Sequence, residues 1–446
     1  MKQLLAETRR FDADETGSVT VLNVYFTIVL CILAGIAIDL AMLTQARTQL
    51  QVAADAAAHA AIVTREWEDE ATSKAKAVEV ANANLSPAFG VALEESDIVF
   101  GTYDKASHVF TADSSVGLDS VYVMTERALA DSNPVGSFLL KFIGFTQWDV
   151  RTTSVYETYV PTCFREGFVA GLRIDIQSRN DYKDGFCIHS NTHVEVNQNN
   201  TYETGVIVSM PNTDDLVIPA NATDKNEGLD KALRSSKYDI KILNRLDEIK
   251  NGLNDPNSKY YRDFLISNSI VTKNLTKNNN TLTKAEIVAL SPDNKDGHIY
   301  NLNCTKPDST LTLSGGPYHD MAIITNCIVS FGSNEHIYDF SIVITNEDDN
   351  SWSSSSSLTL GIDDNCGDGG SAQIVTYGGS HSAAGLEIYG SQVIAAKNIA
   401  FTSQAIGHGA AVVAGGTIDG TTNMNMAYCG ANMDDNFTAE YFRLAG

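Results

Sequence analysis

GSVTVLNVYFTIVLCILAGIAIDLAMLTQARTQLQVAADAAAHAAIVT, residues 17–64, is the stretch of sequence that decides the fold. Its first part, Val19 to Leu43, consists of 25 mostly apolar residues. A helix of that length spans roughly 37 Å, which is enough to cross a bilayer. No proline or pair of glycines interrupts the residues that follow. The sequence therefore predicts one continuous helix, with its first half in lipid and its second half in water.

The second half of the predicted helix carries a stripe of small apolar residues. They recur at intervals of four, three, four and four residues, which places them on one helical face. They are Ala46, Leu50, Ala53, Ala57 and Ala61. Because small side chains let another backbone approach closely, we expect the stripe to be a packing face. The candidates for its partner are the chain's own following domain and the helix of another protein.

A cleaved signal peptide is the competing interpretation of the apolar run. Such a peptide has an apolar core of roughly 7–15 residues, then a cleavage site and a break. The run here is longer and continues into a helical segment, so a retained membrane anchor is favoured. Lys2, Arg9 and Arg10 precede the run, whereas only Arg47 follows it closely. Since basic residues near a span set its orientation, we expect residues 1–18 to be a cytoplasmic tail and the bulk to be exported.

Asp39 is a carboxylate near the outer end of the apolar run. The favoured interpretation is a solvated residue at the end of the span, within reach of lipid headgroups. The alternative is a residue that pairs with a partner inside the membrane, since intramembrane carboxylates are often functional.

The composition limits the partners of the exported part. The chain has 446 residues, with 55 acidic and 31 basic side chains and a formal net charge of −24. This length predicts two or three domains after the anchor. Nucleic acids and anionic lipid surfaces both require basic patches, so neither is expected as the main partner.

The seven cysteines divide into one and six. Cys31 lies in the apolar run, and the other six lie in the exported part, which predicts three disulfides in an oxidising compartment. Six cysteines allow many pairings. The least entangled pairing along the chain joins Cys163 to Cys187, Cys304 to Cys327 and Cys366 to Cys429. A metal centre is not expected, because no CxxC spacing occurs among them.

Residues 44–160 are expected to form a small, pilin-like α+β domain. A helical pattern continues through residues 66–85 until Ser86-Pro87 discourages it. Alternating apolar positions then predict strands, and an apolar stretch from Asn133-Pro134 to Ile143 predicts a short helix. The predicted strands are 97–103, 107–111, 120–128 and 148–160.

Residues 161–446 change to short strands separated by Gly, Ser, Asn and Asp turns. Such a ladder of short strands suits a parallel β-helix, whose coils stack their apolar side chains on one another. A β-sandwich is the alternative. A charged segment at about 225–265 has apolar residues at helical intervals and predicts a helical insertion. The Asn-rich residues 268–282 are predicted to form a surface loop.

The anchor region resembles a known family. A Gly-Ser-Val-Thr-Val run enters the apolar stretch, and an Ala-Ala-Asp-Ala-Ala-Ala block occupies residues 53–58. In these features the sequence resembles the Tad (Flp) pilus assembly proteins of the TadG-like type. The positions that carry the resemblance are Gly17, Gly35, Asp39, Arg47 and Asp55.

The resemblance implies a single-pass protein of the bacterial inner membrane with its bulk in the periplasm. It also implies that the partners are other Tad pilus assembly proteins or pseudopilins. The TadE and TadF relatives are pseudopilins cut after a glycine, and such processing is associated with a Glu five residues later. Counting from Gly17, Leu22 occupies that position. Processing and pilin-like assembly are therefore not expected.

Motifs for catalysis are absent from the sequence, which has no GxSxG elbow, P-loop, HExxH or GxGxxG before a helix. The run Asp175-Ile176-Gln177-Ser178 falls short of the DxSxS metal motif of adhesive von Willebrand A domains. What remains is an acidic Gly-rich turn that could bind calcium, with scattered carboxylates and histidines. These are Asp363, Asp364 and Asp368; Asp339, Glu347, Asp348 and Asp349; and His319, His336, His381 and His408.

Each of these groups has a simpler interpretation as turn or surface residues. No catalytic, cofactor-binding or metal-binding residue is assigned, and a protein without enzymatic activity is expected. The expected function is that of a membrane-anchored structural or assembly component of a Tad-type pilus, acting through protein partners in the envelope. The alternative is an anchored β-helix protein that binds or cleaves polysaccharide. Carboxylates gathered in one groove of the β-helix would favour that alternative.

Overall fold

A computed structural model describes residues 16–446 except 114–118, 267–268, 307, 355, 368–369, 383–384, 403 and 431–432. The chain divides into two compact units. The first comprises Met1–Tyr159 with Tyr441–Gly446, and the second comprises Val160–Glu440. The predicted tail, residues 1–18, lies almost wholly outside the described residues. The predicted exported domain, 161–446, differs from the second unit at its end, because residues 441–446 pair with a strand of the first unit.

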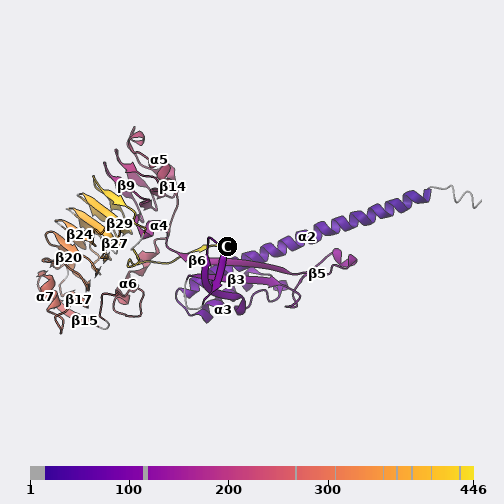
Figure 1. Ribbon diagram of the computed structural model, residues 1–446, viewed down its shortest axis with the longest axis horizontal. Helices are drawn as coiled ribbons and strands as arrows, with labels where there is room; N and C mark the ends of the chain where they lie inside the picture. Colours follow the sequence, from indigo (N-terminus) through magenta and orange to yellow (C-terminus); the bar gives the residue numbers. More distant parts are fainter. Residues whose placement is uncertain are drawn as a thin grey trace, which may run out of the picture. The chain divides into compact units, whose positions relative to one another are not determined.

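The first unit begins with a helical hairpin (Figure 1). Helix α2 (Thr16–Arg65) is continuous for 50 residues, about 75 Å at the usual rise per residue. Helix α3 (Glu70–Asn84) packs against its second half. The predicted continuation of one helix past residue 65 is wrong. A turn intervenes, and Asp69 starts the new helix by accepting the backbone N–H of Thr72 at 2.8 Å.

An antiparallel sheet packs on this hairpin. Its strand order is β2-β1-β3-β6-β32. The 3₁₀ turns η1 (Pro87–Phe89) and η2 (Glu95–Asp97) lead into it, and the strands are β1 (Ile98–Asp104), β2 (Val109–Ala112), β3 (Ser120–Arg127), β6 (Val150–Tyr159) and β32 (Tyr441–Leu444). Tyr159 pairs with Tyr441, so the second unit is inserted between two neighbouring strands of this sheet.

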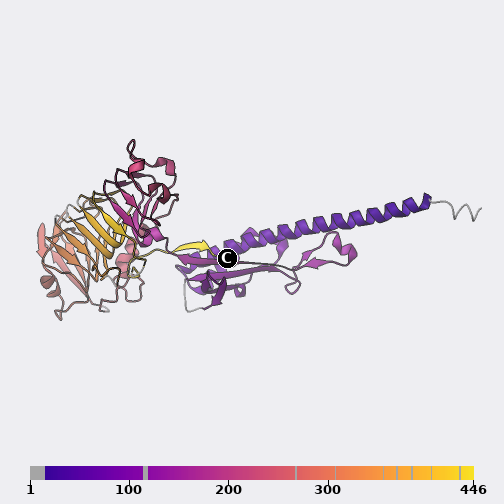
Figure 2. The ribbon, with the colours of Figure 1, turned by 45° about the horizontal axis from the view of Figure 1, so that its top comes forward.

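The segment between β3 and β6 differs from the predicted short helix. It forms a small hairpin of β4 (Val135–Gly136) and β5 (Gln147–Trp148), with the 3₁₀ turn η3 (Leu140–Ile143) near its tip. Pairing of β4 with β5 uses the residues that the predicted helix required, so only one helical turn remains. Figures 1 and 2 both show this hairpin beside the middle of α2.

The second unit is built from parallel strands that stack coil on coil (Figure 2). Gly167 pairs with Cys187, and Val393 pairs with Val412, so one coil takes about 20 residues. This is a strand-rich region with parallel sheets in a β-helix-like arrangement. The parallel ladders do not fit the alternative of a β-sandwich, whose sheets are antiparallel.

Two long sheets form the walls of the coils. The larger has the path β14-β13-β10-β7-β29-β27-β25-β22-β19-β17-β15, and the smaller has the order β11-β8-β30-β28-β26-β23-β20-β18-β16. The larger contains β7 (Gly167–Ala170), β10 (Cys187–Ser190), β13 (Ile207–Met210), β14 (Leu233–Ser235), β15 (Ile270–Leu275), β17 (His298–Cys304), β19 (Met321–Thr325), β22 (Phe340–Ile344), β25 (Ala372–Thr376), β27 (Leu386–Ala395) and β29 (Ala405–Ala414).

The smaller sheet contains β8 (Ile174–Ile176), β11 (Val194–Val196), β16 (Asn279–Leu282), β18 (Thr310–Leu313), β20 (Ile328–Phe331), β23 (Trp352–Ser354), β26 (Ser380–Ser382), β28 (Ile399–Phe401) and β30 (Ile418–Asp419). Shorter pairings complete the coils: β9 (Asp181–Lys183), β12 (Thr201–Tyr202), β21 (Glu335–Ile337), β24 (Leu358–Leu360) and β31 (Asn425–Ala427). The helices of this unit are short: α4 (Thr162–Arg165), α5 (Leu229–Ala232), α6 (Leu246–Gly252) and α7 (Lys284–Val288).

The coils do not stack in chain order. Strand β7, from the start of the unit, pairs with β29 from near its end. The chain builds its first coils outward from β7 to β14, crosses to the opposite end at β15, and then builds back towards β7. In Figure 1 the yellow strands therefore lie beside the magenta ones.

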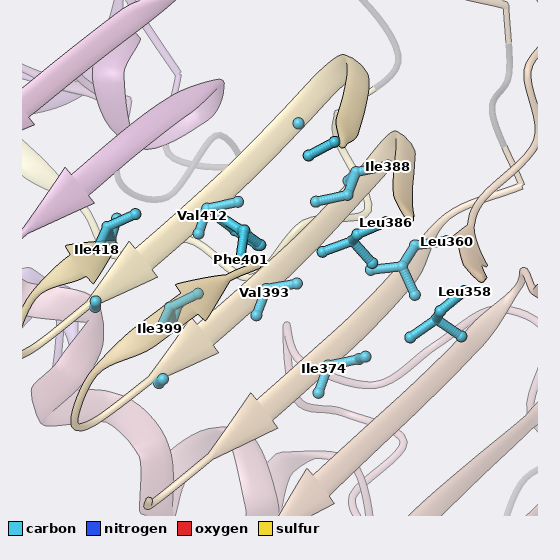
Figure 3. Close-up of a cluster of buried hydrophobic side chains, with 14 of the residues drawn as sticks. Leu358, Leu360, Ile374, Leu386, Ile388, Val393, Ile399, Phe401, Val412 and Ile418 are labelled. Atoms are coloured by element: carbon cyan, nitrogen blue, oxygen red, sulfur yellow. The ribbon is translucent and has the colours of Figure 1, made fainter. Parts of the chain in front are cut away.

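The interior of the coils is a column of apolar side chains. Ile374 stacks on Val393, Val393 on Val412, and Val412 on Phe168, and all four are at most 1% exposed. Figure 3 shows part of this core, with Ile374, Val393 and Val412 on successive strands. Since burial of one such side chain contributes about 1.5–3 kcal/mol, the repeated stack is the main stabilising feature of the unit.

The connecting segment between the two sets of coils is less helical than predicted. Between 225 and 265 the structure has α5, the 3₁₀ turn η6 (Lys241–Arg245) and α6, joined by extended chain. The segment lies against the large sheet, where the Tyr377 hydroxyl donates to Asp247 at 2.7 Å. Apolar residues of the segment, among them Ile240, Leu246 and Ile249, are buried although the segment forms no long helix.

The predicted Asn-rich surface loop at 268–282 is also wrong. Residues of this segment form β15 and β16, which pair with β17 and β18 on one side. Among the described strands they are the last of their sheets, so one edge of each has no described neighbour and polar side chains are tolerated there.

Three disulfides occur in the second unit. They join Cys163 to Cys187, Cys304 to Cys327 and Cys366 to Cys429, and Cys31 is free and exposed. These are the pairs that proximity along the chain favours.

Candidate functional site

The apolar surface of α2 is the first part of the candidate site. Large apolar side chains between Val19 and Met42 are exposed, and Tyr25 and Leu30 are 66% and 63% exposed. Among the described residues, α2 is the one helix long and apolar enough to cross a membrane. Water offers no favourable contact to such a surface, whereas lipid does. The first half of α2 is a candidate membrane span.

The predicted small-residue stripe is buried within the first unit. All five stripe residues are at most 6% exposed. Ala53, Ala57 and Ala61 pack with Ala77 and Ala81 of α3 and with apolar residues of β1 and β3. Ala46 and Leu50 pack in a second cluster with Phe89, Val135 and Val150. The partner of the stripe is therefore the chain's own α+β unit, the first of the two candidates.

Hydrogen bonds fix the register of α2 on the sheet. The Thr125 hydroxyl donates to the Leu50 carbonyl at 3.1 Å. The Gln51 amide donates to the Asp55 carboxylate and to the Thr153 carbonyl, both at 2.9 Å. Asp55, one of the motif positions, thus orients a side chain that bridges helix and sheet.

Asp39 is a buried carboxylate that accepts backbone hydrogen bonds, not a solvated one. Its carboxylate accepts the backbone N–H groups of Phe138 at 2.6 Å and Leu140 at 2.7 Å, and that of Leu139 at 3.2 Å. These N–H groups belong to the first residue of η3 and the two residues before it, and such groups at the start of a helical turn have no acceptor within the turn itself. The favoured expectation of a solvated carboxylate is therefore corrected: Asp39 fastens the hairpin tip to α2, and it is only 3% exposed. Pairing with a partner inside the membrane stays a prediction.

The remaining motif positions take different places along α2. A Cβ atom added to Gly35 would lie 3.1 Å from the Cβ of Leu139, so glycine permits the hairpin to approach the helix closely. Arg47 is exposed, and Gly17 lies in the first turn of the helix. Gly35 and Asp39 act together, because both contact the same hairpin.

One group of side chains in the second unit has the composition of a metal site. Asp296, His319 and Asp320 have ligand atoms within 4.8 Å of one another, and no other such group occurs in the described chain. The Lys284 ammonium already lies in this group, 3.2 Å from an Asp296 oxygen and 2.6 Å from Nε2 of His319. A bound lysine supplies the positive charge that a metal ion would bring, so the group is a poor metal site.

The predicted calcium turn and the scattered carboxylates lie apart in the described residues. Asp364 accepts the backbone N–H of Gly367 at 2.7 Å, an ordinary turn contact, and Asp368 lies outside the described residues. Glu347, Asp348 and Asp349 are exposed in a loop after β22, where Asp349 pairs with Lys397 at 2.9 Å. Asp339 precedes β22, and burial, with Asp320 nearby, raises the pKa of its carboxyl.

Of the four histidines that the sequence singled out, His319 and His336 both contact the ring of Tyr338, while His381 and His408 lie on other strands. His319 contacts the Lys284 ammonium, as described above, and His336 contacts the Gly361 carbonyl at 2.7 Å. His381 lies on β26, and His408 lies 3.9 Å from an Asp363 oxygen. They do not gather in one groove.

A column of carboxylates that sequence reasoning missed lies on the smaller sheet. Asp175 pairs in register with Glu195 on one side and with Asp419 on the other. Arg173 pairs with Asp419 at 2.6 Å and with Glu195 at 3.5 Å, while burial raises the pKa of the Asp175 carboxyl. Asp175 and Asp419 are too far apart in sequence for any local signal, and only the parallel pairing of β8 with β30 brings them together.

Together the fold and the site define a class: a candidate single-span membrane protein whose anchor continues into an α+β unit, into which a β-helix-like unit is inserted. The chain belongs to the family described as "Domain of unknown function (DUF7867)", whose model matches residues 167–430. Residues 17–76 match a second model, described as "Putative Flp pilus-assembly TadE/G-like" (Tad). The resemblance noted in the anchor region is thereby confirmed.

The comparisons with individual proteins add little. No curated protein matches the chain. A crystal structure of an ice-binding protein from the Antarctic ascomycete Antarctomyces psychrotrophicus is 13% identical and covers 59% of this chain and 94% of that one, with a TM-score of 0.20. A likeness at this level carries nothing about fold or ligand.

Proposed function

We propose that this protein is a membrane-anchored structural or assembly component of a Tad-type (Flp) pilus or tight-adherence secretion system. It acts by binding other proteins in the envelope and catalyses no reaction. The observation that carries the proposal is the division of α2: an exposed apolar half precedes a buried half that holds the α+β unit. Such a helix anchors a folded unit at a fixed distance from the bilayer, and the Tad match covers the same residues.

The proposed topology places the N-terminus in the cytoplasm and both units in the periplasm, with one span in the inner membrane. Lys2, Arg9 and Arg10 before the span support this orientation. The three disulfides support an oxidising compartment for the second unit.

Intact mass and thiol counting test this topology on protein purified from membranes. We expect a chain that keeps its anchor, and a single alkylated cysteine, Cys31, when the unreduced protein is unfolded. A mature chain that begins at Ser18 or beyond Ala53 would contradict the anchor. Three or more reactive thiols would contradict the periplasmic location.

The proposed partners are other Tad assembly proteins or pseudopilins, bound by the exported surfaces. The test is affinity purification of the tagged full chain from crosslinked membranes of a bacterium that assembles Tad pili. A matched control replaces residues 19–34 with an unrelated apolar helix of equal length, which keeps the anchor and the hairpin contacts. A second control is an unrelated single-span protein with the same tag.

We expect Tad proteins to be enriched with the full chain over the unrelated protein. If the chain with the replaced helix recovers Tad proteins equally well, the exported units make the contact. If that chain recovers none, the membrane span makes the contact. Recovery of no Tad protein with the intact chain would overturn the proposal.

A second candidate function is binding or cleavage of polysaccharide by the second unit. The carboxylate column of Asp175, Glu195 and Asp419 favours it, because carboxylates accept hydrogen bonds from sugar hydroxyls. The ion pairs of Arg173 with two of the three oppose it, since these carboxylates are already partnered. Binding of the bacterium's own envelope and extracellular polysaccharides, compared between wild type and Asp175→Asn, separates the two functions. Retention that Asp175→Asn abolishes, or release of reducing ends, would favour this candidate.

A further inference from the structure

The tip of the β4–β5 hairpin presents an apolar surface that the described residues of the first unit leave exposed. We call residues 137–146, with the sequence SFLLKFIGFT, the apolar finger. Phe138, Phe142, Ile143 and Phe145 are 54%, 79%, 50% and 59% exposed. Lys141 is the only charged residue of the finger. Four large apolar side chains in so short a segment form the kind of exposed patch that marks an interaction site.

The finger is fastened beside the candidate membrane span. Its contacts with α2 are at Gly35 and Asp39, within the apolar run that ends at Leu43. At the usual helical rise, these two positions lie about 12 and 6 Å along the axis from Leu43. The finger therefore sits level with the last turns of the apolar run, and Figures 1 and 2 both show the hairpin alongside the helix there.

Most backbone N–H groups of the finger have an acceptor within the protein, as a segment in lipid requires. Seven of its N–H groups donate within the protein: those of Phe138, Leu139 and Leu140 to Asp39, and those of Ser137, Phe142, Gly144 and Phe145 to carbonyls of the finger itself. In lipid an unsatisfied N–H has no water to donate to, so only segments whose N–H groups have internal partners enter it. A solvent-exposed loop has no such requirement.

The polar and aromatic groups of the finger have the arrangement of a membrane interface. The Lys141 ammonium lies 5.9 Å from the ring centre of Phe138 and 5.8 Å from that of Phe142, at the end of a flexible apolar stem. Such a stem can lie along apolar surface while its charge reaches the headgroups. Phe145 stacks on Trp148 with ring centres 6.4 Å apart, and tryptophan is one of the residues that concentrate at bilayer interfaces.

We propose that the apolar finger inserts into the bilayer interface beside α2, so that the first unit contacts the membrane at two points. Lipid is the occupant of the exposed face, because that face continues the exposed apolar surface of α2 at the same level. This inference rests on the proposed function only in that α2 must span the membrane. A second contact prevents the first unit from rotating and tilting freely about α2. The ends of β6 and β32, between which the second unit is inserted, then keep a fixed orientation relative to the bilayer.

Fluorescence quenching in lipid vesicles tests the proposal on the full chain. A Cys31→Ser background is given a single new thiol by Phe142→Cys, or by Ile143→Cys in case the first change disturbs the finger. The thiol is labelled with NBD without reduction of the disulfides, and the protein is reconstituted in phosphatidylcholine and phosphatidylglycerol with or without doxyl-labelled lipid. Val109→Cys, at an exposed position on β2, is the matched water-facing control. Wild type labelled at Cys31 reports on the span.

We expect the probes on the finger to emit at shorter wavelength than the β2 probe and to lose intensity with doxyl lipid, as the Cys31 probe does. Quenching at Cys31 without quenching at either finger position would overturn the inference and leave the anchor intact. If the Cys31 probe is not quenched either, both the inference and the proposed anchor fail.

Discussion

At the scale of single residues, Asp39 shows how a recognisable position acquires its role from a distant partner. The sequence marks it as a carboxylate in an apolar run, and the expectation is a solvated group or one that pairs with a partner inside the membrane. Its actual partners, the N–H groups of residues 138–140, lie about 100 positions away in the chain. No local pattern connects the two segments, because the contact depends on how the hairpin folds back onto α2.

Replacement of Asp39 should release the apolar finger. Asp39→Ala removes the acceptor for three N–H groups, and loss of a comparable helix cap costs about 1 kcal/mol, or roughly fivefold in a local opening equilibrium. We expect amide hydrogen exchange at residues 138–140 to accelerate by about that factor. Asp55→Ala, on the same helix but without contact to the finger, is the control. Equal exchange in wild type and Asp39→Ala would contradict the role of the carboxylate.

His189 is a buried residue whose titration should make the second unit sensitive to pH. Its ring contacts the Ser209 hydroxyl at 2.8 Å and the Asn191 side chain at 3.0 Å, and Asn191 in turn holds the backbone of Tyr238. Burial disfavours the charged imidazole and lowers the pKa of His189 below the ordinary histidine value of about 6.5. The unfolded chain therefore takes up a proton at higher pH than the folded one.

The contribution of His189 to stability is present above pH 6.5 and is lost as the pH falls through its folded pKa. We expect wild type to lose stability relative to His189→Gln between about pH 7.5 and 5.5. Urea unfolding followed by Trp352 fluorescence, with Trp67 and Trp148 replaced by Phe, measures this difference. His381→Gln, at a half-exposed position, is the control, and a pH-independent difference for His189→Gln would contradict the prediction.

At the scale of elements, the spacing of apolar residues predicted which face of a helix is buried. It predicted less well what packs on that face and where the helix ends. The stripe on α2 was predicted residue by residue, because helical spacing alone puts small residues on one side. That the helix ends at Arg65 was missed, since the signal is a single capping aspartate, Asp69, within a continuing Ala-rich pattern. The strands β15 and β16 were missed for a different reason. Their polar composition resembles a loop, and only their place at the end of the sheets makes it acceptable.

Enlargement of the stripe should disrupt the first unit. Ala53→Leu with Ala57→Leu adds side-chain volume at two positions with no exposed surface, against α3 and the sheet. Overpacking of a filled core typically costs about 1–3 kcal/mol. We expect lower resistance to protease and less protein in the membrane fraction. Gln45→Leu with Val52→Leu, at exposed positions on the same helix, should have little effect. If both pairs behave alike, the stripe is only helix-favouring composition.

At the scale of the whole molecule, the inventory of strands was predictable and their order was not. Short strands with Gly and Asn turns indicated stacked coils, because each coil buries apolar residues on the next. Nothing in the sequence indicated that β7 would pair with β29, since parallel pairing of distant strands leaves no signature in either segment. The carboxylate column on the smaller sheet was missed for the same reason. The return of residues 441–446 to the first sheet was likewise outside the reach of local patterns.

Because residues 441–446 return to the sheet of the first unit, we expect this unit to fold without residues 160–440. Tyr159 and Tyr441 are direct partners in an antiparallel pair, so a two-residue Asn-Gly turn can join them and replace residues 160–440. We expect this shortened chain to keep the protease resistance of the anchored unit. A chain that ends at Tyr159 lacks β32, whose Arg443 pairs with Glu157, and Ala445 just after it, whose N–H donates to the Val155 carbonyl at 2.8 Å. Its β6 edge is left open, so we expect faster proteolysis and aggregation. Equal resistance of the two chains would show that β32 adds no stability, and loss of both would show that the first unit depends on the second.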